Sequence, residues 1–166
     1  DDYIQYEIIN DSAKNTPVIF FPPIDGGFET YISLGFFEKL KDLQILLFNP
    51  HTIHLYDRTK KIKLYQETTI NEVAEDYLLR LKKIYPKGPY CLAGYSSGGE
   101  LAFSVAKELV KQGDKISKLI ILDSYPNEQW TNESKTKLNI DQVILCKCTE
   151  MEDLMKVHKK EFIKHI

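Results

Sequence analysis

Residues 90–99 read YCLAGYSSGG, and this stretch decides the fold. The apolar block at its beginning predicts a buried strand, and the apolar positions spaced through residues 101–110 predict a helix. Between them, residues 94–98 match the G-x-S-x-G pattern of a nucleophilic serine on a strand-to-helix turn. The pattern predicts a strained turn in which two glycines let the backbones approach and Ser96 stands above the sheet. A glycine-rich turn without a function is the alternative, which the strand-turn-helix context disfavours.

Apolar blocks and amphipathic stretches alternate on both sides of this motif. Thr69 and Glu72 form a capping box before a helix whose apolar residues recur every three or four positions. The alternation predicts an α/β fold with a mostly parallel, doubly wound sheet, right-handed crossovers and helices on both faces. The further predicted strands are residues 18–21, 44–48 and 118–122, and the further predicted helices are residues 30–41 and 69–84.

The residue composition and spacing pattern of the chain change after residue 126. Residues 127–139 are polar, and the unevenly spaced apolar residues of 140–166 are more typical of a helix than of a strand. Residues 143–146 (VILC) also suit a strand, so the pattern alone leaves both interpretations open.

Composition excludes several classes of protein. The 166 residues are 43% hydrophobic and 28% charged, which is ordinary for one globular domain. Lys and Arg number 22 against 24 Asp and Glu, and this net charge of −2 argues against a nucleic-acid-binding surface. No apolar run approaches the roughly 20 residues of a membrane helix, and no secretion signal is visible at Asp1. Three cysteines fit a reducing, cytoplasmic setting, and Cys146 and Cys148 have no second pair at metal-site spacing.

Three predicted loops, residues 22–27, 94–99 and 123–126, place candidate catalytic residues at one edge of such a sheet, beyond the carboxyl ends of the strands. Ser96 would act as a nucleophile, and the N–H of Ser97 at the helix start would stabilise an oxyanion. A second N–H donor is expected in the loop at residues 22–27 (PPIDGG). Asp123 ends the neighbouring strand, where its carboxylate would orient a histidine base. An aspartate that caps a turn with Ser124 is the alternative.

The histidine base is difficult to place. His51 and His54 precede the serine in a polar loop. His158 and His165 follow Asp123 in the expected chain order, but they lie in a Lys-rich, helix-like segment that is typical of a solvated face. None of the four is a convincing general base, so the chain as given is expected to lack one.

Several of these motifs together resemble the thioesterase domains that terminate nonribosomal peptide synthetases. The resemblance covers roughly residues 17–126. It is carried by residues 20–26 (FFPPIDG), 88–90 (GPY), 94–99 (GYSSGG), 101–103 (LAF) and 122–125 (LDSY). It implies the α/β-hydrolase fold and transfer of a finished chain from the phosphopantetheine arm of a carrier domain onto a serine. The chain is then released to water or, as a macrocycle, to a nucleophile of its own.

Carried over by position, the resemblance assigns the nucleophile to Ser96, the acid to Asp123 and the oxyanion-hole N–H groups to Ile24 and Ser97. The family usually has an alanine where Ser97 stands, and a serine is small enough for the turn to survive. The family's histidine follows a helical lid and a further strand, so we expect it beyond Ile166.

The leading hypothesis is a serine thioesterase that releases a peptidyl or acyl chain from a carrier-bound phosphopantetheine thioester by hydrolysis or macrocyclisation. It would need no cofactor or metal, and its partner would be an acyl or peptidyl carrier domain. We expect a monomeric domain of a larger cytoplasmic synthetase, with an α/β-hydrolase core at residues 1–126 and a linker with a partial helical lid at residues 127–166. The alternatives are a stand-alone repair thioesterase, a carboxylesterase, or a non-catalytic hydrolase-like module that binds acyl carriers.

Overall fold

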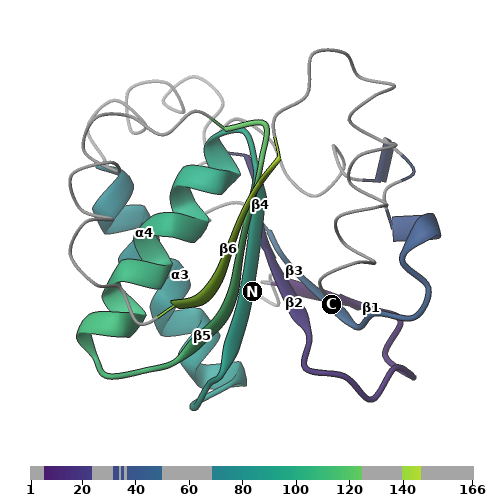
Figure 1. The fold of residues 1–166 in the computed structure, drawn as a ribbon, viewed down its shortest axis with the longest axis horizontal. Helices are drawn as coiled ribbons and strands as arrows, with labels where there is room; N and C mark the ends of the chain where they lie inside the picture. The colour runs from purple at the N-terminus through teal and green to yellow at the C-terminus, as the bar shows by residue number, and fades with distance from the viewer. Residues whose placement is uncertain are drawn as a thin grey trace, which may run out of the picture.

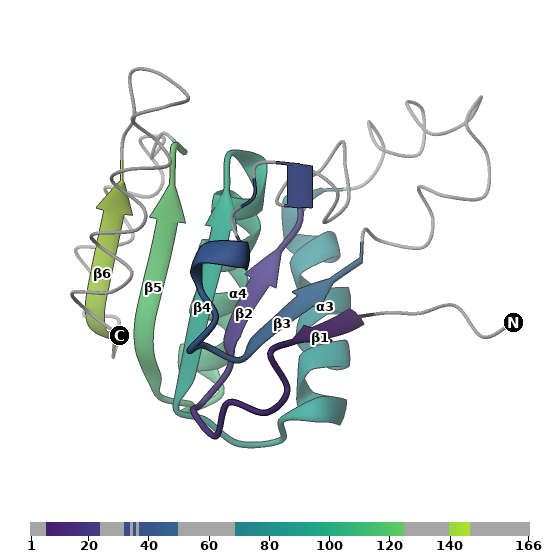
Figure 2. The same ribbon diagram turned by 90° about the vertical axis from the view of Figure 1, so that its right-hand side faces the viewer.

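Six strands build one sheet in the order β1-β3-β2-β4-β5-β6 (Figures 1 and 2). The computed structural model describes residues 6–23, 32–33, 35, 37–49, 69–124 and 140–146. β1 runs antiparallel to β3, and the other pairings of this sheet are parallel, so β2 to β6 have their carboxyl ends at the same edge. The strands are β1 (Tyr6–Ile9), β2 (Val18–Phe21), β3 (Ile45–Phe48), β4 (Tyr90–Tyr95), β5 (Ile116–Leu122) and β6 (Ile140–Cys146).

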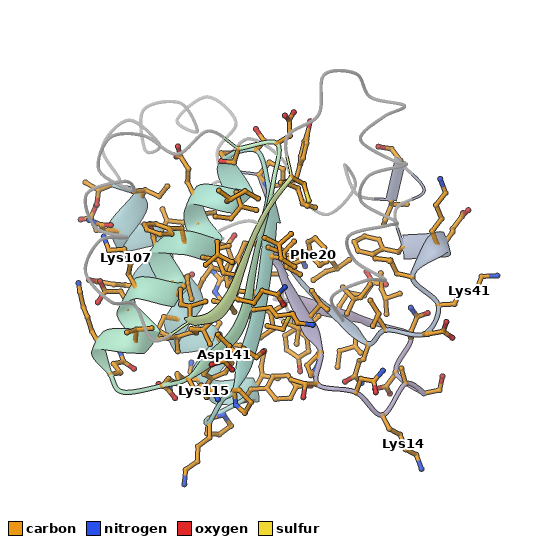
Figure 3. The ribbon with its side chains drawn as sticks, in the orientation of Figure 1. Lys14, Phe20, Lys41, Lys107, Lys115 and Asp141 are labelled. Atoms are coloured by element: carbon orange, nitrogen blue, oxygen red, sulfur yellow. The ribbon has the colours of Figure 1, made fainter. Side chains whose placement is uncertain are left out.

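Two helices, α3 (Ile70–Ile84) and α4 (Ser97–Lys111), lie side by side on one face of the sheet (Figure 1). On the other face, the 3-10 turn η1 (Phe37–Lys39) packs its aromatic ring edge-on against Phe20, with 5.8 Å between the ring centres. Phe20 lies deep in the interior, as Figure 3 shows. Because the sheet is covered on both faces, every residue of β2 and β3 is buried, which is why these strands are continuous apolar blocks.

Aromatic side chains fix the carboxyl ends of β2 and β3 to α3. The ring centre of Phe21 lies 5.6 Å from that of Phe48 and 5.6 Å from that of Tyr77. The Tyr77 hydroxyl donates a hydrogen bond of 2.9 Å to the carbonyl of Asn49, just past β3. Aromatic pairs combine a large buried area with a preferred geometry. This cluster therefore holds two strand ends in place beside the edge where the chemistry is expected.

The predicted capping box at the start of α3 is confirmed. The Thr69 hydroxyl accepts a hydrogen bond of 3.3 Å from the N–H of Glu72. In return, the Glu72 carboxylate accepts bonds from the Thr69 N–H at 2.7 Å and from the Thr69 hydroxyl at 2.8 Å. These bonds, the one from the backbone first, hold the pKa of Glu72 below its ordinary value.

Replacing Thr69 by alanine is expected to lower the free energy of unfolding by about 1 kcal/mol, because the first turn of α3 loses its cap. The exposed Thr16→Ala change serves as the control and should stay within about 0.5 kcal/mol of the parent protein. Urea unfolding at neutral pH measures both. Since the pKa of Glu72 is lowered on folding, its contribution is present above the ordinary value and is lost as the pH falls through the lowered one. The loss in the free energy of unfolding that Thr69→Ala causes should therefore become smaller in acid. A loss that does not depend on pH would contradict this account.

The expected helix over residues 30–41 is correct at residues 32–33, which are α-helical, and wrong from residue 35 onward. Gly35 has a positive φ of 58°, and the turn that follows it, η1, is a 3-10 turn rather than α-helix. A residue in the left-handed region ends a right-handed helix. In consequence the described segment covers one sheet face with a short turn, while α3 and α4 both cover the other.

The end of the chain also differs from the expectation. Residues 140–146 form β6, a strand paired in parallel with β5 from Ile140 to Cys146, so the helical interpretation is wrong there and the alternative of a strand is correct. The pattern misled because β6 has an open face: Val143 and Leu145 are exposed, whereas Ile144 and Cys146 are buried. The division between a core and a partial lid stays a prediction, since residues 125–139 and 147–166 lie outside the described part.

The remaining predicted elements are confirmed, namely the strands at residues 18–21, 44–48, 90–93 and 118–122 and the helices at residues 69–84 and 101–110. β1 was not predicted. It is a four-residue edge strand whose two central residues are exposed, so it has neither an apolar block nor a clear alternation.

Candidate active site

The ends of the central strands meet where the site is expected. The register pairs Phe21 of β2 with Gly94 of β4, Tyr95 of β4 with Leu122 of β5, and Leu122 in turn with Cys146 of β6. Figure 2 shows these strands pointing in the same direction. Paired strands lie about 4.8 Å apart. The residue that follows β4 and the residue that follows β5 are therefore neighbours at one edge of the sheet.

Ser96 occupies the sharp turn between β4 and α4, as the motif predicts. Its backbone has a φ of 53° and a ψ of −129°, outside the regions that non-glycine residues ordinarily use. Such a conformation costs about 1–3 kcal/mol and persists only where the surroundings impose it. Here the N–H of Ser96 donates 2.9 Å to the carbonyl of Leu122, and its carbonyl accepts 2.9 Å from the N–H of Gly99. The residue is exposed, so the turn presents it to solvent rather than to the core.

The flanking glycines are required by backbone contacts. A β-carbon at Gly94 would collide with the carbonyl group of Gly98, four residues on. A β-carbon at Gly98 would collide with the carbonyl oxygen of Phe21 and would lie 3.0 Å from the carbonyl carbon of Pro22. The first contact closes the turn around Ser96. The second places the segment that leaves β2 directly against the first turn of α4.

The start of α4 is the candidate oxyanion hole. Ser96 is the N-cap residue of α4 and Ser97 is its first residue, half-buried. Helix N-termini direct N–H groups and the positive end of the dipole outward, which stabilises negative charge. The second predicted donor, Ile24, lies outside the described residues. Pro22 and Pro23, which precede it, are described and buried, and Pro22 lies beside Gly98.

Asp123 lies at the tip of the strand next to Ser96. Its N–H donates a hydrogen bond of 2.7 Å to the carbonyl of Cys146, and its φ of 46° is in the left-handed region. The backbone at the end of β5 thus bonds to the turn at Ser96 on one side, through Leu122, and to β6 on the other, through Asp123. The structure brings Ser96 and Asp123 to adjacent strand ends, half-buried in the case of Asp123 and exposed in the case of Ser96. Their catalytic roles stay predictions.

The four histidines of the chain, His51, His54, His158 and His165, lie outside the described residues. The described segments contain no group of three His, Cys, Asp or Glu side chains that suits a metal ion.

Burial raises the pKa of the Cys91 thiol to about 12, so this cysteine on β4 stays protonated at neutral pH and is a poor nucleophile. None of the helices in the described segments has the length and hydrophobicity of a bilayer span.

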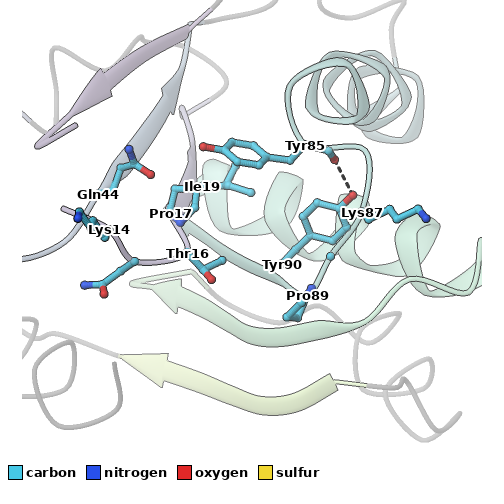
Figure 4. A pocket seen from close by; sticks show the side chains of 11 residues that line it. Lys14, Thr16, Pro17, Ile19, Gln44, Tyr85, Lys87, Pro89 and Tyr90 are labelled. Carbon is cyan, nitrogen blue, oxygen red and sulfur yellow. Dashed lines mark hydrogen bonds between the residues drawn. The ribbon is translucent and has the colours of Figure 1, made fainter. Parts of the chain in front are cut away.

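A cavity of about 370 Å³ lies at the opposite edge of the sheet (Figure 4). Its lining includes Ile19, Tyr85 and Tyr90, and the Tyr90 hydroxyl donates 2.7 Å to the Tyr85 carbonyl. At its rim, the amide of Gln44 is bonded to the Asp11 carboxylate. Since active sites of parallel α/β sheets form beyond the carboxyl ends of the strands, the predicted active site stays at the edge with Ser96 and not in this cavity.

Two contributions to the site were not predicted from the sequence. The carbonyl of Cys146 holds the backbone of Asp123, and the signal for it was the strand interpretation of residues 143–146. The side chain of Ser124 lies against Gly99 in the first turn of α4. This second contact joins residues 25 positions apart in the sequence, and no local pattern marks it.

Comparison with known sequences identifies relatives among peptide synthetases. The sequence model of the thioesterase domain family matches residues 16–164. The N-(5-amino-5-carboxypentanoyl)-L-cysteinyl-D-valine synthase of Amycolatopsis lactamdurans is 31% identical over 120 residues, which are 72% of this chain and 3% of that protein. The synthase of the same description from Penicillium rubens is 32% identical over 128 residues, 76% of this chain and 3% of that protein. The chain thus spans 3% of the length of these multidomain relatives.

Solved structures share the fold. The NocB thioesterase domain, in a covalent complex with a fluorophosphonate nocardicin G analog, is 20% identical with a TM-score of 0.60, over 97% of this chain and 69% of that one. The thioesterase domain SrfTE is 24% identical with a TM-score of 0.53, over 96% of this chain and 64% of that one. The architecture is therefore the α/β-hydrolase fold, as expected. With the family match extending over most of its length, the chain belongs to the thioesterase domain family.

Proposed function

We propose that the chain is a serine thioesterase that receives a peptidyl or acyl chain from the phosphopantetheine arm of a carrier domain onto Ser96. The observation that carries the proposal is the strained, exposed turn at Ser96, bonded through its N–H to the strand that ends in Asp123. A serine held in this conformation at a helix N-terminus is the arrangement that the G-x-S-x-G motif serves.

In the proposed reaction the Ser96 oxygen attacks the thioester carbonyl carbon, and the hydroxyl proton passes to a histidine base that Asp123 orients. The tetrahedral oxyanion accepts hydrogen bonds from the N–H of Ser97 and, by resemblance, of Ile24. The carbon–sulfur bond then breaks, and the pantetheine thiolate takes the proton from the imidazolium. Water, or a hydroxyl or amine of the bound chain, attacks the resulting ester and returns Ser96 to its free form.

The helix dipole of α4 contributes to the same step. Its positive end lies at Ser96, where negative charge grows as the tetrahedral intermediate forms. The half-buried setting of Ser97 reduces competition from water. Each oxyanion donor of this kind lowers the barrier by about 3–4 kcal/mol in serine hydrolases.

The test is to incubate the full-length protein with an acyl-pantetheine thioester, quench in acid and map the acyl group by mass spectrometry. We expect one acyl group as an ester on the peptide that contains Ser96. Pre-treatment with a fluorophosphonate, which phosphonylates activated serines, should prevent its incorporation. Acyl incorporation elsewhere, or undiminished incorporation after fluorophosphonate treatment, would show that Ser96 is not the nucleophile.

The same assay separates the alternatives. A carrier-delivered peptidyl chain that loads faster than a short acyl group supports the terminal thioesterase. The reverse preference supports a repair thioesterase, and turnover of simple oxyesters supports a carboxylesterase. Binding of a carrier domain without any acylation would support the non-catalytic module. The first two outcomes agree with transfer of a carrier-bound chain to Ser96, and the last two contradict it.

A further inference from the structure

The segment that follows β5, which contains Asp123 and Ser124, touches the first turn of α4 at Gly99. A β-carbon built at this glycine would lie 2.9 Å from the Ser124 β-carbon, 3.2 Å from the Ser124 hydroxyl oxygen and 2.9 Å from Cγ2 of Ile121. The Ser124 side chain therefore occupies the space in which any larger residue at position 99 would place its side chain. Position 99 is in the first turn of α4, and Ser124 directly follows Asp123.

Asp123 depends on its neighbours for its direction. Its φ of 46° turns the chain sharply, so the path of the backbone before and after it decides where the carboxylate points. Up to Asp123, two hydrogen bonds hold the backbone: the Leu122 carbonyl accepts one from the N–H of Ser96, and the N–H of Asp123 donates one to the Cys146 carbonyl. After Asp123, the chain is held by the contact of Ser124 with Gly99.

We propose that Ser124 is a positioning residue, which by seating against Gly99 sets the direction of Asp123 relative to Ser96. The inference rests on the proposed function, because it acts through Asp123 as the acid of a serine hydrolase. It replaces the interpretation of the Asp123–Ser124 pair as a simple turn cap. The contact joins the segment after β5 to the first turn of α4, so a displacement of this turn also moves Asp123.

The β-carbon of Ser124 carries this role. It is nearer than the hydroxyl oxygen to the space above Gly99, by 2.9 Å against 3.2 Å. Ser124→Ala keeps the β-carbon and should keep the position of Asp123. Ser124→Gly removes it and frees the chain after Asp123, while Gly99→Ala inserts a methyl group into the contact and pushes Ser124 away.

Single-turnover acylation of the full-length protein by an acyl-pantetheine thioester tests the proposal. We expect Ser124→Ala to stay within about twofold of the parent protein. Ser124→Gly should lower the maximal acylation rate about tenfold and Gly99→Ala about a hundredfold, because misplacement of a catalytic group by 1 Å costs on this order. We expect the half-saturating concentration to stay unchanged, because the proposed role of Ser124 is to position the acid and not to bind substrate. Ser124→Gly remains informative if Gly99→Ala does not fold.

The decisive measurement repeats Ser124→Gly in an Asp123→Asn background. If Ser124 acts through Asp123, Ser124→Gly should have no further effect on the acylation rate there. The double variant Gly99→Ala/Ser124→Gly, in which the intruding methyl group regains space, should recover part of the rate lost in Gly99→Ala. An undiminished effect of Ser124→Gly in the Asp123→Asn background would show a general structural role and overturn the proposal. So would a loss in Ser124→Ala equal to that in Ser124→Gly.

This outcome is separate from failure of the proposed function. Acylation that persists in a Ser96→Ala variant would show that Ser96 is not the nucleophile, whatever the Ser124 variants do. Acylation that requires Ser96 but responds to Ser124→Gly independently of Asp123 would agree with the proposed thioesterase and contradict only the positioning role of Ser124.

Discussion

Ser96→Ala is expected to abolish acylation of the protein by an acyl-pantetheine thioester. Removing the nucleophile of a serine hydrolase lowers kcat by a factor on the order of 10⁶, because the covalent path is lost and only residual stabilisation by the oxyanion donors remains. The backbone should tolerate the change, since alanine keeps the β-carbon. Fluorophosphonate labelling and acyl loading followed by mass spectrometry measure the loss.

The matched control for this variant is Ser104→Ala on the same helix. Ser104 lies eight residues further along α4 and is buried, away from the turn. Its replacement should leave the labelling rate within about threefold, as expected for a position without contact to the reacting atoms. Equal labelling of the Ser96→Ala protein and its parent would refute the assignment of the nucleophile.

Gly94→Ala is expected to have the second-largest effect, this time on both stability and reactivity. The added methyl group would collide with the carbonyl group of Gly98, which is backbone and cannot rotate away. Overpacking at such a site costs about 3 kcal/mol, and the turn can relieve it only by moving Ser96 away from its place above β4. A displacement of about 1 Å would lower the rate of fluorophosphonate labelling about a hundredfold.

Gly113→Ala is the control for a glycine replacement in the same part of the fold. Gly113 follows α4 with a φ of 85°, and a β-carbon there would meet nothing within 4 Å. The variant should lose about 1 kcal/mol of stability through backbone strain alone and should be labelled at the parent rate. Thermal unfolding and labelling kinetics separate the two effects. A Gly94→Ala protein that labels like its Gly113→Ala counterpart would mean that the turn geometry does not govern the reactivity of Ser96.

The parts of the fold that were predicted correctly are those in which burial leaves a local pattern. β2 and β3 are buried on both faces, so they appear as continuous apolar blocks. The capping box at Thr69 marks the start of α3 because its hydrogen bonds are made within four residues. The turn at Ser96 could be predicted because its requirement for small residues at fixed positions is also local.

The errors arise where distant contacts decide the structure. β6 exposes Val143 and Leu145 on one face, so its apolar residues do not mark a buried block, and only the pairing with β5 makes it a strand. The region of Gly35 leaves the helical conformation although its apolar residues suit a helix. The contact between Gly99 and Ser124 depends on how α4 packs on β5, which no spacing rule expresses.

The hydrogen bond from Asp123 to Cys146 has a consequence for the order in which this end of the sheet can form. The turn at Ser96 needs only β2, β4, α4 and the end of β5, all of which are synthesised by residue 122. The hydrogen bond that holds the backbone of Asp123 forms only when residue 146 has been added and β6 has paired with β5. During synthesis, the partners of the turn at Ser96 are therefore present in the chain before the partner that holds Asp123.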